Sequence, residues 1–359
     1  MKILITGANG FVGKNLSAFL PRHELYRYDV ETDPSLLDNY CRDAGFVFHL
    51  AGANRPADPK EYMEVNFGFT ALLLETLKKH GNTCPIVLSS STQAALNNPY
   101  GQSKLAGENL LKEYGKKTGA KVIIYRFPNL FGKWCRPNYN SAVATFCFNI
   151  ARGLPVTIND PNTELTLAYI DDVLIEFQHA LEGAESEIIT YKETLGRIVE
   201  LLESFRDSRM TLSVPNTADP FVKKLHATYL SYLPEDKFLY PLKMNVDSRG
   251  SFTEILRSKY HGQISVNISK PSIVKGNHWH HTKVEKFLVV SGEGVIRFRL
   301  INSGDVTEYR VSGEKLEVVD IPPGYAHNIE NTGKVDLVTL MWCNELYNPE
   351  RPDTIFLEV

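Results

Sequence analysis

The stretch KILITGANGFVG, Lys2–Gly13, decides the fold of the first half of this 359-residue chain. Its first five residues form a short apolar run typical of a buried strand, and Phe11–Leu20 has helical spacing. Between them Gly7, Gly10 and Gly13 are spaced G-x-x-G-x-x-G. A glycine-rich turn between a first strand and a first helix lets the backbone approach a pyrophosphate, which the free N–H groups of the helix then bind. The stretch predicts a dinucleotide-binding unit.

The alternation of strand and helix continues through the first half of the chain. Further apolar runs typical of strands lie at Glu24–Asp29, Phe46–Leu50, Pro85–Ser89 and Val122–Arg126. Segments with helical spacing include Lys60–His80, Tyr100–Lys117 and Asp172–Leu181. Repetition of strand, helix and strand predicts an α/β fold, a Rossmann-like doubly wound parallel sheet with helices on both faces.

The pattern changes after about residue 240. Over Ile296–Leu300, apolar residues alternate with two arginines, the period of two that indicates half-buried strands. Similar short apolar runs lie before and after this stretch, separated by glycine, proline and asparagine. No long amphipathic helix is predicted between them. The sequence therefore predicts two domains, a nucleotide-binding domain at 1–240 and an all-β barrel at 241–359, with the change near Tyr232–Tyr240.

The composition limits the classes of function. The chain has 39 Lys and Arg against 42 Asp and Glu, a formal net charge of −3, and 43% hydrophobic residues. These values exclude a disordered or fibrous chain, and the near-neutral charge argues against non-specific nucleic-acid binding. Five scattered cysteines without a C-x-x-C pair are typical of a reducing compartment. With neither a signal peptide nor an apolar span in view, we expect a cytoplasmic protein with no nucleic-acid or membrane partner.

Candidate cofactor-binding residues follow the strands of the first half. Leu50, Ala51 and Gly52 end the third apolar run, where small residues let a cofactor lie close to the backbone. Asn66 belongs to a predicted helix near the same cleft. The candidates are Gly7, Gly10, Phe11, Val12, Gly13, Asp29, Leu50, Ala51, Gly52 and Asn66.

The end of the second run leaves the choice of cofactor open. A carboxylate at the position of Asp29 commonly binds the adenosine ribose hydroxyls and favours NAD over NADP. Arg27, two residues earlier, could instead bind the 2′-phosphate of NADP. Asp29 could also be a plain cap for the following helix. NADPH and NADH are therefore both compatible with this strand end.

Tyr100 and Lys104 form the candidate catalytic pair of the first half. They are four residues apart, so they share one face of a helix. The ammonium of Lys104 is expected to lower the pKa of Tyr100, which would make its phenol an acid or base near neutral pH. A serine hydroxyl from Ser89–Thr92 could orient a carbonyl or an alcohol beside it.

Residues 1–240 resemble the extended short-chain dehydrogenase/reductase family, in the branch that acts on nucleotide sugars. The matching motifs are TGANGFVG at 6–13, HLAG at 49–52, VN at 65–66, SSS at 89–91, YGQSK at 100–104, RFPNLFG at 126–132 and AYIDDV at 168–173. The resemblance implies that Tyr100 transfers the proton, that Lys104 holds it and the cofactor ribose, and that Ser91 binds the reacting oxygen. Ser90 is a rival to Ser91, since the following linker is short. Arg126 and Asn129 are the implied substrate-binding residues.

A second cluster of candidate ligands lies in the other half. His278 and His280 are two apart in a predicted strand, so both side chains face the same side. Glu285 begins the next strand, and His327 follows a Pro-Pro-Gly turn. Imidazole and carboxylate groups together suit zinc, iron, manganese or nickel. His281 would face the opposite side and is left outside the site.

These residues resemble the two motifs of the cupin family. The first motif, H-x-H, four residues, E, six residues, G, is matched by His278, His280, Glu285 and Gly292. The second motif, P-x-G, two residues, H, three residues, N, is matched by Pro322, Gly324, His327 and Asn331. The resemblance implies a divalent cation, expected to be Zn²⁺, held by the three histidines and Glu285. The identity of the metal, the role of His278 as a ligand and a metal-free barrel with structural histidines all stay open.

The combination of the two halves resembles the bifunctional capsular polysaccharide synthesis enzymes. The resemblance implies that the barrel epimerises C3 of a UDP-2-acetamido-2,6-dideoxy-4-hexulose and that the reductase domain reduces its C4 ketone with NADPH. The product would be UDP-N-acetyl-6-deoxy-L-talosamine, on the way to UDP-N-acetyl-L-fucosamine, and the protein would be a homodimer. Candidates for the proton relay of the barrel are Lys283, Lys286 and Tyr325.

Two alternatives to this hypothesis remain. The barrel could be a non-catalytic sugar-binding or dimerisation module on a single-activity nucleotide-sugar 4-keto reductase. It could also be a metal-dependent domain of the dioxygenase type. Under the bifunctional hypothesis, the metal could be catalytic or could only hold the barrel together.

Overall fold

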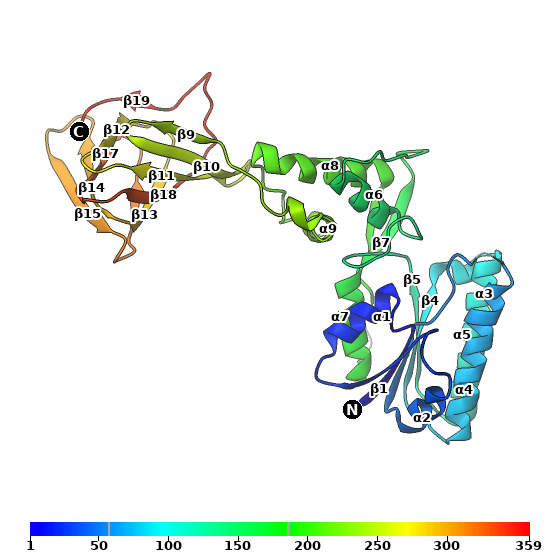
Figure 1. Cartoon of the computed structure of the whole chain (residues 1–359). Coiled ribbons are helices and arrows are strands. Elements are labelled where there is room, and N and C mark those ends of the chain that lie inside the picture. Colours follow the sequence, from blue (N-terminus) through cyan, green and yellow to red (C-terminus); the bar gives the residue numbers. More distant parts are fainter. Residues whose placement is uncertain (57, 185–186) are drawn as a thin grey trace. The chain divides into compact units, whose positions relative to one another are not determined.

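A computed structural model of the chain describes residues 1–56, 58–184 and 187–359 (Figure 1). The chain divides into two compact units, one of 1–203 with 217–234 and one of 204–216 with 235–359. The segment Ser204–Asn216, which lies within the first of the two domains expected from the sequence, is thus part of the second unit. Within the described residues, no helix has both the length and the apolar character needed to cross a bilayer.

The first unit is built on a five-stranded sheet in the order β2-β1-β3-β4-β5, with every pair parallel. The strands are β1 (Lys2–Thr6), β2 (Glu24–Tyr28), β3 (Phe46–His49), β4 (Ile86–Ser91) and β5 (Val122–Phe127). The helices around it are α1 (Phe11–Phe19), α2 (Leu36–Asp43), α3 (Glu61–Met63), α4 (Phe69–Lys79), α5 (Pro99–Thr118) and α7 (Ile170–Leu181). A π-helix, η1 (Glu64–Gly68), joins α3 to α4, and a 3₁₀ turn, η2 (Thr92–Ala95), precedes α5.

Helices cover both faces of this sheet. Successive side chains of β1 point to opposite faces, so they are buried in two separate cores. Ile3 and Ile5 pack with Leu16 of α1 and Phe177 of α7 in one core. Leu4 packs with apolar residues of α2, α4 and α5 in the other core. All of these named side chains are fully buried, and burial of one such side chain stabilises the fold by about 1.5–3 kcal/mol. The predicted doubly wound parallel sheet is confirmed (Figure 1).

The rest of the first unit is a smaller layer. It contains a three-stranded sheet in the order β6-β7-β8 and two helices. Their bounds are β6 (Asn129–Phe131), α6 (Ala142–Ala151), β7 (Glu164–Tyr169), β8 (Tyr191–Thr194) and α9 (Pro220–Leu230). Helix α8 (Leu195–Thr211) contributes residues to both units. A 3₁₀ turn, η3 (Glu235–Lys237), lies at the start of residues 235–359, the longer of the two segments of the second unit.

The second unit consists of two antiparallel sheets. One has the order β16-β13-β18-β11-β10-β9 and the other β15-β14-β17-β12-β19. The strands are β9 (Met244–Asp247), β10 (Gly250–Ser258), β11 (Gly262–Ser269), β12 (Val274–Trp279), β13 (Glu285–Ser291), β14 (Glu293–Leu300), β15 (Val306–Ser312), β16 (Val318–Ile321), β17 (Tyr325–Asn331), β18 (Leu337–Cys343) and β19 (Ile355–Phe356). Phe287 and Val289 of the first sheet share a buried core with Ile296 and Ile329 of the second. The predicted all-β cupin-like fold is confirmed.

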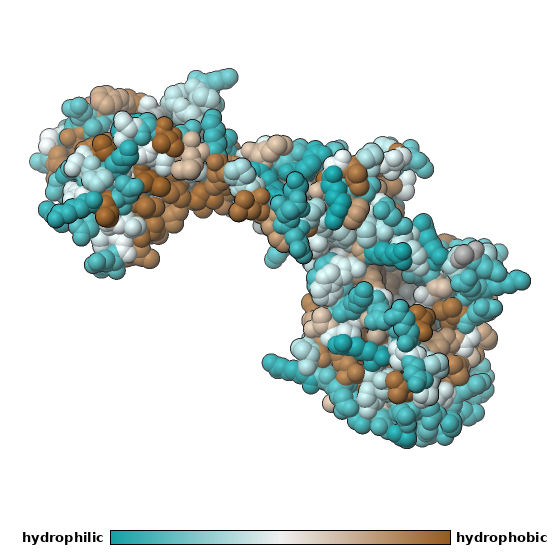
Figure 2. All heavy atoms as spheres, viewed as in Figure 1, coloured by the Kyte–Doolittle hydropathy of each residue, from teal (hydrophilic) through white to brown (hydrophobic). Residues whose placement is uncertain are grey.

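The surface of the second unit includes apolar side chains at the edges of its larger sheet. Figure 2 shows apolar atoms gathered on part of the visible face of this unit. Met244 and Val246 on the edge strand β9 are 56% and 69% exposed, and Val318 on the opposite edge strand β16 is 58% exposed. Exposed apolar edges of this kind are typical of surfaces that pair with another chain.

Candidate active site and metal centre

A cleft of about 610 Å³ lies at the carboxyl ends of β1, β3 and β4. The glycine-rich loop after β1 forms one wall of it. Gly7 has φ +68°, and a Cβ there would lie 2.7 Å from the backbone nitrogen of Ala51. A Cβ on Gly13 would lie 2.2 Å from the carbonyl oxygen of Gly7. Only glycine fits these two positions, and this lets the loop backbone and the first turn of α1 face the cleft.

Seven of the ten predicted cofactor-binding residues line this cleft, and three are not among its lining residues. Those that line it are Gly7, Gly10, Phe11, Val12, Gly13, Leu50 and Gly52. Asp29 directly follows β2, and its Oδ2 accepts a hydrogen bond of 2.7 Å from the N–H of Asn9 in the glycine loop. Ala51 faces the end of β1 and donates its N–H to Thr6 Oγ1 at 3.3 Å. These two residues therefore support the walls of the cleft.

Asn66, the third, fastens two walls of the cleft to each other. It lies in the π-helix η1 and is 5% exposed. Its Nδ2 donates to Ser103 Oγ of α5 at 2.9 Å, and its Oδ1 accepts from the N–H of Ala53 at 3.1 Å. Helix α5 is thereby tied to the loop that follows β3. A Cβ on Gly52 would lie 2.7 Å from Lys104 Nζ, so this loop and the lysine are in close contact.

Tyr100, Lys104 and Ser91 come together in the cleft. All three line it. Lys104 Nζ lies 5.9 Å from the centre of the Tyr100 ring and donates to the carbonyl of Ser89 at 3.2 Å. The Tyr100 hydroxyl donates to Asn54 Oδ1 at 3.0 Å and is also within reach of the Ser91 hydroxyl. The hydroxyl of Ser90, by contrast, donates to Glu108 Oε1 at 2.6 Å. The geometry thus favours Ser91 over Ser90 as the hydroxyl beside Tyr100.

Burial controls the protonation of this pair. It raises the pKa of the Tyr100 phenol, and the hydrogen bond with Ser91 opposes only part of that rise. Burial also lowers the pKa of the Lys104 ammonium to about 8. The expectation that Lys104 lowers the Tyr100 pKa is therefore wrong for this structure, because removal from water disfavours both charged forms.

The two predicted substrate-binding residues have different positions. Asn129, the first residue of β6, lines the cleft and donates its Nδ2 to the carbonyl of Thr166 at 3.3 Å. Arg126 is absent from the cleft lining and pairs instead with the buried carboxylate of Glu108, through contacts of 2.8 and 2.7 Å. The Glu108 side chain is only 1% exposed. The geometry gives Arg126 a structural partner, Glu108, on the same helix as Tyr100.

Replacing Arg126 by methionine is expected to lower the free energy of unfolding by about 2 kcal/mol, because the Glu108 carboxylate then stays buried without its main counter-ion. The Michaelis constant for the nucleotide sugar expected as substrate from the sequence should change by no more than about twofold, since Arg126 lies outside the cleft. Urea unfolding and steady-state kinetics measure the two effects.

The control for this variant is Lys112→Met, which removes a more exposed cation 3.4 Å from the same carboxylate. It should cost less than about 1 kcal/mol. A Michaelis constant raised about tenfold in Arg126→Met, with no loss of stability, would favour direct substrate binding instead.

Several lining residues of the cleft were missed from the sequence. They lie on the loop after β6 and are Trp134, Arg136, Tyr139, Asn140 and Ser141. The Arg136 guanidinium lies 5.2 Å from the centre of the Tyr139 ring. Trp134 and Asn138 have φ of +67° and +55°, so the loop has an unusual backbone conformation. The aromatic and basic residues of KWCRPNYNS, directly after the RFPNLFG motif, were the signal that could have found them.

The four candidate metal ligands converge inside the second unit. His278 lies on β12, His280 directly after it, Glu285 begins β13 and His327 lies on β17. One ligand atom from each of the four lies within 4.8 Å of all the others. Glu285 Oε2 lies 3.4 Å from His280 Nε2 and 3.3 Å from His327 Nε2. His281 packs its ring against Trp279 and does not belong to the cluster.

The chemistry of these atoms fits a divalent cation. His280 Nε2, Glu285 Oε2 and His327 Nε2 are buried and have no hydrogen-bond partner among the described residues. A buried polar atom without a partner costs about 1–3 kcal/mol, so three that face one another indicate a ligand between them. Nδ1 of His280 contacts the carbonyl of Asp353, and Nδ1 of His327 lies 3.3 Å from the carbonyl of Tyr325. These contacts leave the two Nε2 atoms free for a metal.

The protonation states agree with metal binding. Burial lowers the pKa of His278 to about 4, so its imidazole is neutral near pH 7, the form that binds metals. Burial alone would raise the pKa of Glu285, but the adjacent His280 and His327 lower it by more. The net pKa lies below the usual value, so the carboxyl is ionised. The cluster therefore offers the neutral imidazole of His278 and one carboxylate oxygen.

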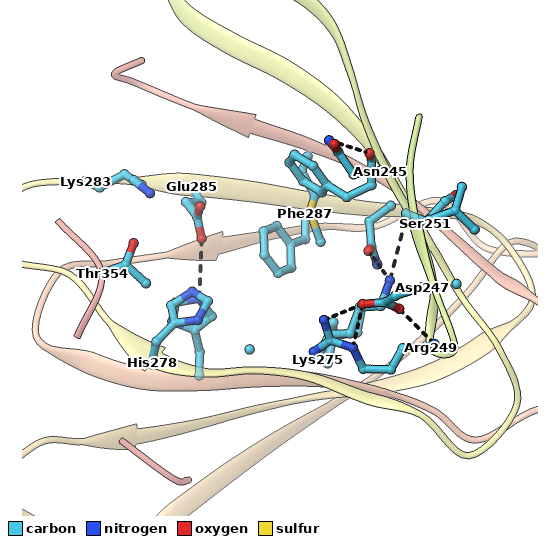
Figure 3. Close-up of a pocket in the computed structure, with 18 residues that line it drawn as sticks. Asn245, Asp247, Arg249, Ser251, Lys275, His278, Lys283, Glu285, Phe287 and Thr354 are labelled. Atoms are coloured by element: carbon cyan, nitrogen blue, oxygen red, sulfur yellow. Dashed lines mark hydrogen bonds and ion pairs between the residues drawn. The ribbon is translucent and has the colours of Figure 1, made fainter. Parts of the chain in front are cut away.

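A cavity of about 660 Å³ extends from this cluster through the barrel. Figure 3 shows Lys283, Glu285 and His278 at one end and Asp247, Arg249 and Lys275 at the other. Apolar lining residues, Phe287 among them, lie between the ends (Figure 3). The cavity thus has room for a small ligand with polar groups at both ends.

The three proton-relay candidates differ in position. Lys283 lines the cavity and is 9% exposed. Lys286 is in an ion pair with Asp320. Tyr325 packs against the hydrophobic core of the barrel. Of the three, Lys283 is the one found among the lining residues of the cavity.

Comparison with protein families agrees with this arrangement of two sites. The family model described as "NAD dependent epimerase/dehydratase family" matches residues 3–189, which hold the glycine loop, Tyr100 and Lys104. The chain belongs to this family. In this family member, residues 245–355 also match a model described as "Polysaccharide biosynthesis C-terminal domain", which contains all four candidate metal ligands.

Similar proteins match the family member over its whole length. The crystal structure of the capsular polysaccharide assembling protein CapF from Staphylococcus aureus is 53% identical, covers 100% of both chains and has a TM-score of 0.96. CapF with the inhibitor 3-isopropenyl-tropolone is 49% identical, with the same coverage and a TM-score of 0.90. UDP-2-acetamido-2,6-beta-L-arabino-hexul-4-ose reductase from Pseudomonas aeruginosa is 43% identical over 99% of this chain and 98% of that protein. These matches confirm the predicted resemblance to capsular polysaccharide enzymes.

Proposed function

We propose that this protein is a nucleotide-sugar reductase of the cytoplasm that carries out two consecutive steps on one intermediate. The second unit inverts C3 of a UDP-2-acetamido-2,6-dideoxy-4-hexulose, and the first unit reduces the C4 ketone with NADPH. The product is UDP-N-acetyl-6-deoxy-L-talosamine, a precursor of UDP-N-acetyl-L-fucosamine for a capsule or another surface polysaccharide. The observation that carries the proposal is the presence, in one chain, of a Ser91–Tyr100–Lys104 cleft and a separate cavity with four convergent metal-ligand side chains.

The residues of the first cleft suit the reduction of a ketone. NADPH supplies the hydride when bound, and the glycine loop with the N-terminus of α1 would hold its pyrophosphate. Ser91 is placed to donate a hydrogen bond to the ketone oxygen. Tyr100 is placed to give its phenolic proton to the oxygen as negative charge develops there. The raised pKa of Tyr100 suits this role, because the phenol is protonated at neutral pH before the reaction.

The exposed Arg27 beside Asp29 supports NADPH over NADH. The two carboxylate oxygens of Asp29 accept the N–H groups of Asn9, at 2.7 Å, and of Val30, at 2.8 Å. Each oxygen thus has one backbone donor and can accept one more hydrogen bond. Arg27 is exposed two residues earlier and has a charge that suits a 2′-phosphate.

The residues of the barrel suit proton transfer at a carbon next to a ketone. His278, His280, Glu285 and His327 would hold a divalent cation, for which we propose Zn²⁺, and such an ion supplies Lewis acidity toward an enolate oxygen. A C4 ketone makes the C3 hydrogen acidic, so a base in the cavity can remove it. Lys283 borders the cavity beside Glu285 and can act on the same part of the sugar.

The two steps support each other. Reduction removes the ketone that makes the C3 hydrogen acidic, so it prevents reversal of the epimerisation. A homodimer is part of the proposal, and the exposed apolar side chains of the edge strand β9 support it. The UDP-activated deoxy-amino sugar is the expected partner, bound in turn by both sites.

The proposal is tested by incubating the purified full chain with the 4-keto sugar in heavy water, with NADPH left out. We expect deuterium to enter at C3, followed by NMR, and full conversion to the reduced product when NADPH is added. Metal analysis of the same preparation should find about one divalent ion per chain. Reduction without any exchange at C3 would instead support the alternative, a single-activity 4-keto reductase with a non-catalytic barrel.

A further inference from the structure

The last part of the chain returns to the strand that carries the first metal ligand. Strand β19 pairs antiparallel with β12, so that Phe356 lies opposite His278 and Ile355 lies opposite Trp279. The N–H of Leu357 also donates to the carbonyl of Asn277 at 3.0 Å. A segment distant in sequence is therefore held against the rim of the candidate metal centre.

Asp353, just before β19, contacts every residue of the loop from His280 to Lys283. Its Oδ1 accepts the N–H of His281 at 2.9 Å. Its Oδ2 accepts the N–H groups of Thr282 at 2.8 Å and of Lys283 at 2.9 Å, and also the Thr282 hydroxyl at 3.2 Å. Its backbone carbonyl contacts Nδ1 of the buried His280. One residue thus binds three consecutive N–H groups and one metal-ligand ring.

This loop is the segment that joins two of the four candidate ligands, His280 and Glu285. Its three N–H groups point at one carboxylate, so without that carboxylate they would lose their acceptor and the loop would be free to take other conformations. The contact of the Asp353 carbonyl with Nδ1 places the proton of His280 on that nitrogen. The other ring nitrogen, Nε2, is directed at Glu285 and lies 3.4 Å from its Oε2.

We propose that Asp353 is a positioning residue of the metal centre. Its carboxylate fixes the distance between His280 and Glu285, and its carbonyl sets the tautomer and the orientation of His280. The inference rests on the proposed metal site, and it adds a residue that belongs to neither cupin motif. Partners of this kind behind a metal ligand typically change metal affinity by about 10–100-fold when they are removed.

The test compares zinc binding by full-length variants. Each protein is stripped with a chelator and then titrated with Zn²⁺ in competition with a chromophoric chelator. We expect Asp353→Ala to bind zinc about 10–100-fold more weakly than the natural chain, and Asp353→Asn, which keeps one acceptor oxygen, to lie between them. Glu350→Ala is the matched control, because Glu350 is an exposed carboxylate of the same segment. It should bind zinc as the natural chain does.

Two further readouts separate positioning from loss of fold. Reduction of a 4-keto sugar that is already inverted at C3 depends on the first unit alone and should be unchanged in all three variants. Co²⁺ bound in place of Zn²⁺ should give an altered visible spectrum in Asp353→Asn. Equal zinc affinity and an equal cobalt spectrum in the natural chain and both Asp353 variants would overturn the inference alone. Failure of the natural chain to bind any divalent ion would overturn the metal centre together with it.

Discussion

Replacement of Tyr100 by phenylalanine is expected to abolish ketone reduction while deuterium exchange at C3 continues. The variant loses only the phenolic hydroxyl, which donates to Asn54 Oδ1 at 3.0 Å and lies beside Ser91 in the cleft. Without that proton donor, charge on the reduced oxygen is not neutralised in the transition state, and kcat should fall by about 10²–10⁴-fold. The fall is measured as NADPH oxidation with the 4-keto sugar, and exchange at C3 is measured by NMR on the same sample.

A neighbouring tyrosine provides the control for this variant. The ring of Tyr62 lies 5.6 Å from that of Tyr100, and its hydroxyl donates to the carbonyl of Asn54 at 3.1 Å. Tyr62→Phe makes the same chemical change outside the cleft lining, so reduction should stay within about threefold of the natural rate. Loss of both reduction and exchange in Tyr100→Phe would contradict two independent sites.

Replacement of Glu285 by glutamine is expected to remove the metal ion and C3 exchange, while reduction of a supplied 4-keto sugar that is already inverted at C3 stays intact. The amide keeps the shape of the side chain but not its charge, and Glu285 is the one carboxylate in the cluster of four candidate ligands. Its Oε2 also lies within 3.4 Å of His280 Nε2 and 3.3 Å of His327 Nε2. Loss of the cation should slow exchange by at least about 10²-fold, because a developing enolate is no longer stabilised.

The outcome of this variant also decides what the metal does. Glu293→Gln, on the exposed first position of β14, serves as the control and should keep both metal and exchange. A Glu285→Gln protein that has lost its metal but still exchanges C3 at the natural rate would show that the ion only holds the barrel together. A variant that keeps its metal in full would remove Glu285 from the ligand set.

The parts of the fold that follow local rules could be predicted from the sequence. The turn at Gly7–Gly13 and the alternation over Ile296–Leu300 depend on neighbours within a few residues, so their periods identify the two kinds of sheet. The spacing of His278 and His280 likewise places two imidazoles on one side of a strand. These local signals were sufficient for the fold class and for the cluster around Glu285.

The parts that depend on distant partners could not be predicted in this way. Arg126 pairs with Glu108, which lies 18 residues earlier on a helix packed against the same sheet, and no local pattern shows that pairing. Burial raises the pKa of Tyr100, and the four-residue spacing between Tyr100 and Lys104 does not indicate how deeply the phenol is buried. Asp353 reaches the loop at Thr282 from 71 residues away. The roles of Arg126, Tyr100 and Asp353 therefore depend on tertiary contacts that no local sequence motif shows.

The position of Asp353 and β19 has a consequence for how the protein is made. The glycine loop, Tyr100 and Lys104 leave the ribosome long before the last strands, so the first unit can fold and take up its cofactor while synthesis continues. The pocket for the cation lacks part of its wall until residues 353–356 have been added to β12. Capture of the proposed metal ion is therefore expected to be a late event in biogenesis, and a newly made chain would be able to reduce a ketone before it gains the isomerase activity proposed for the second unit.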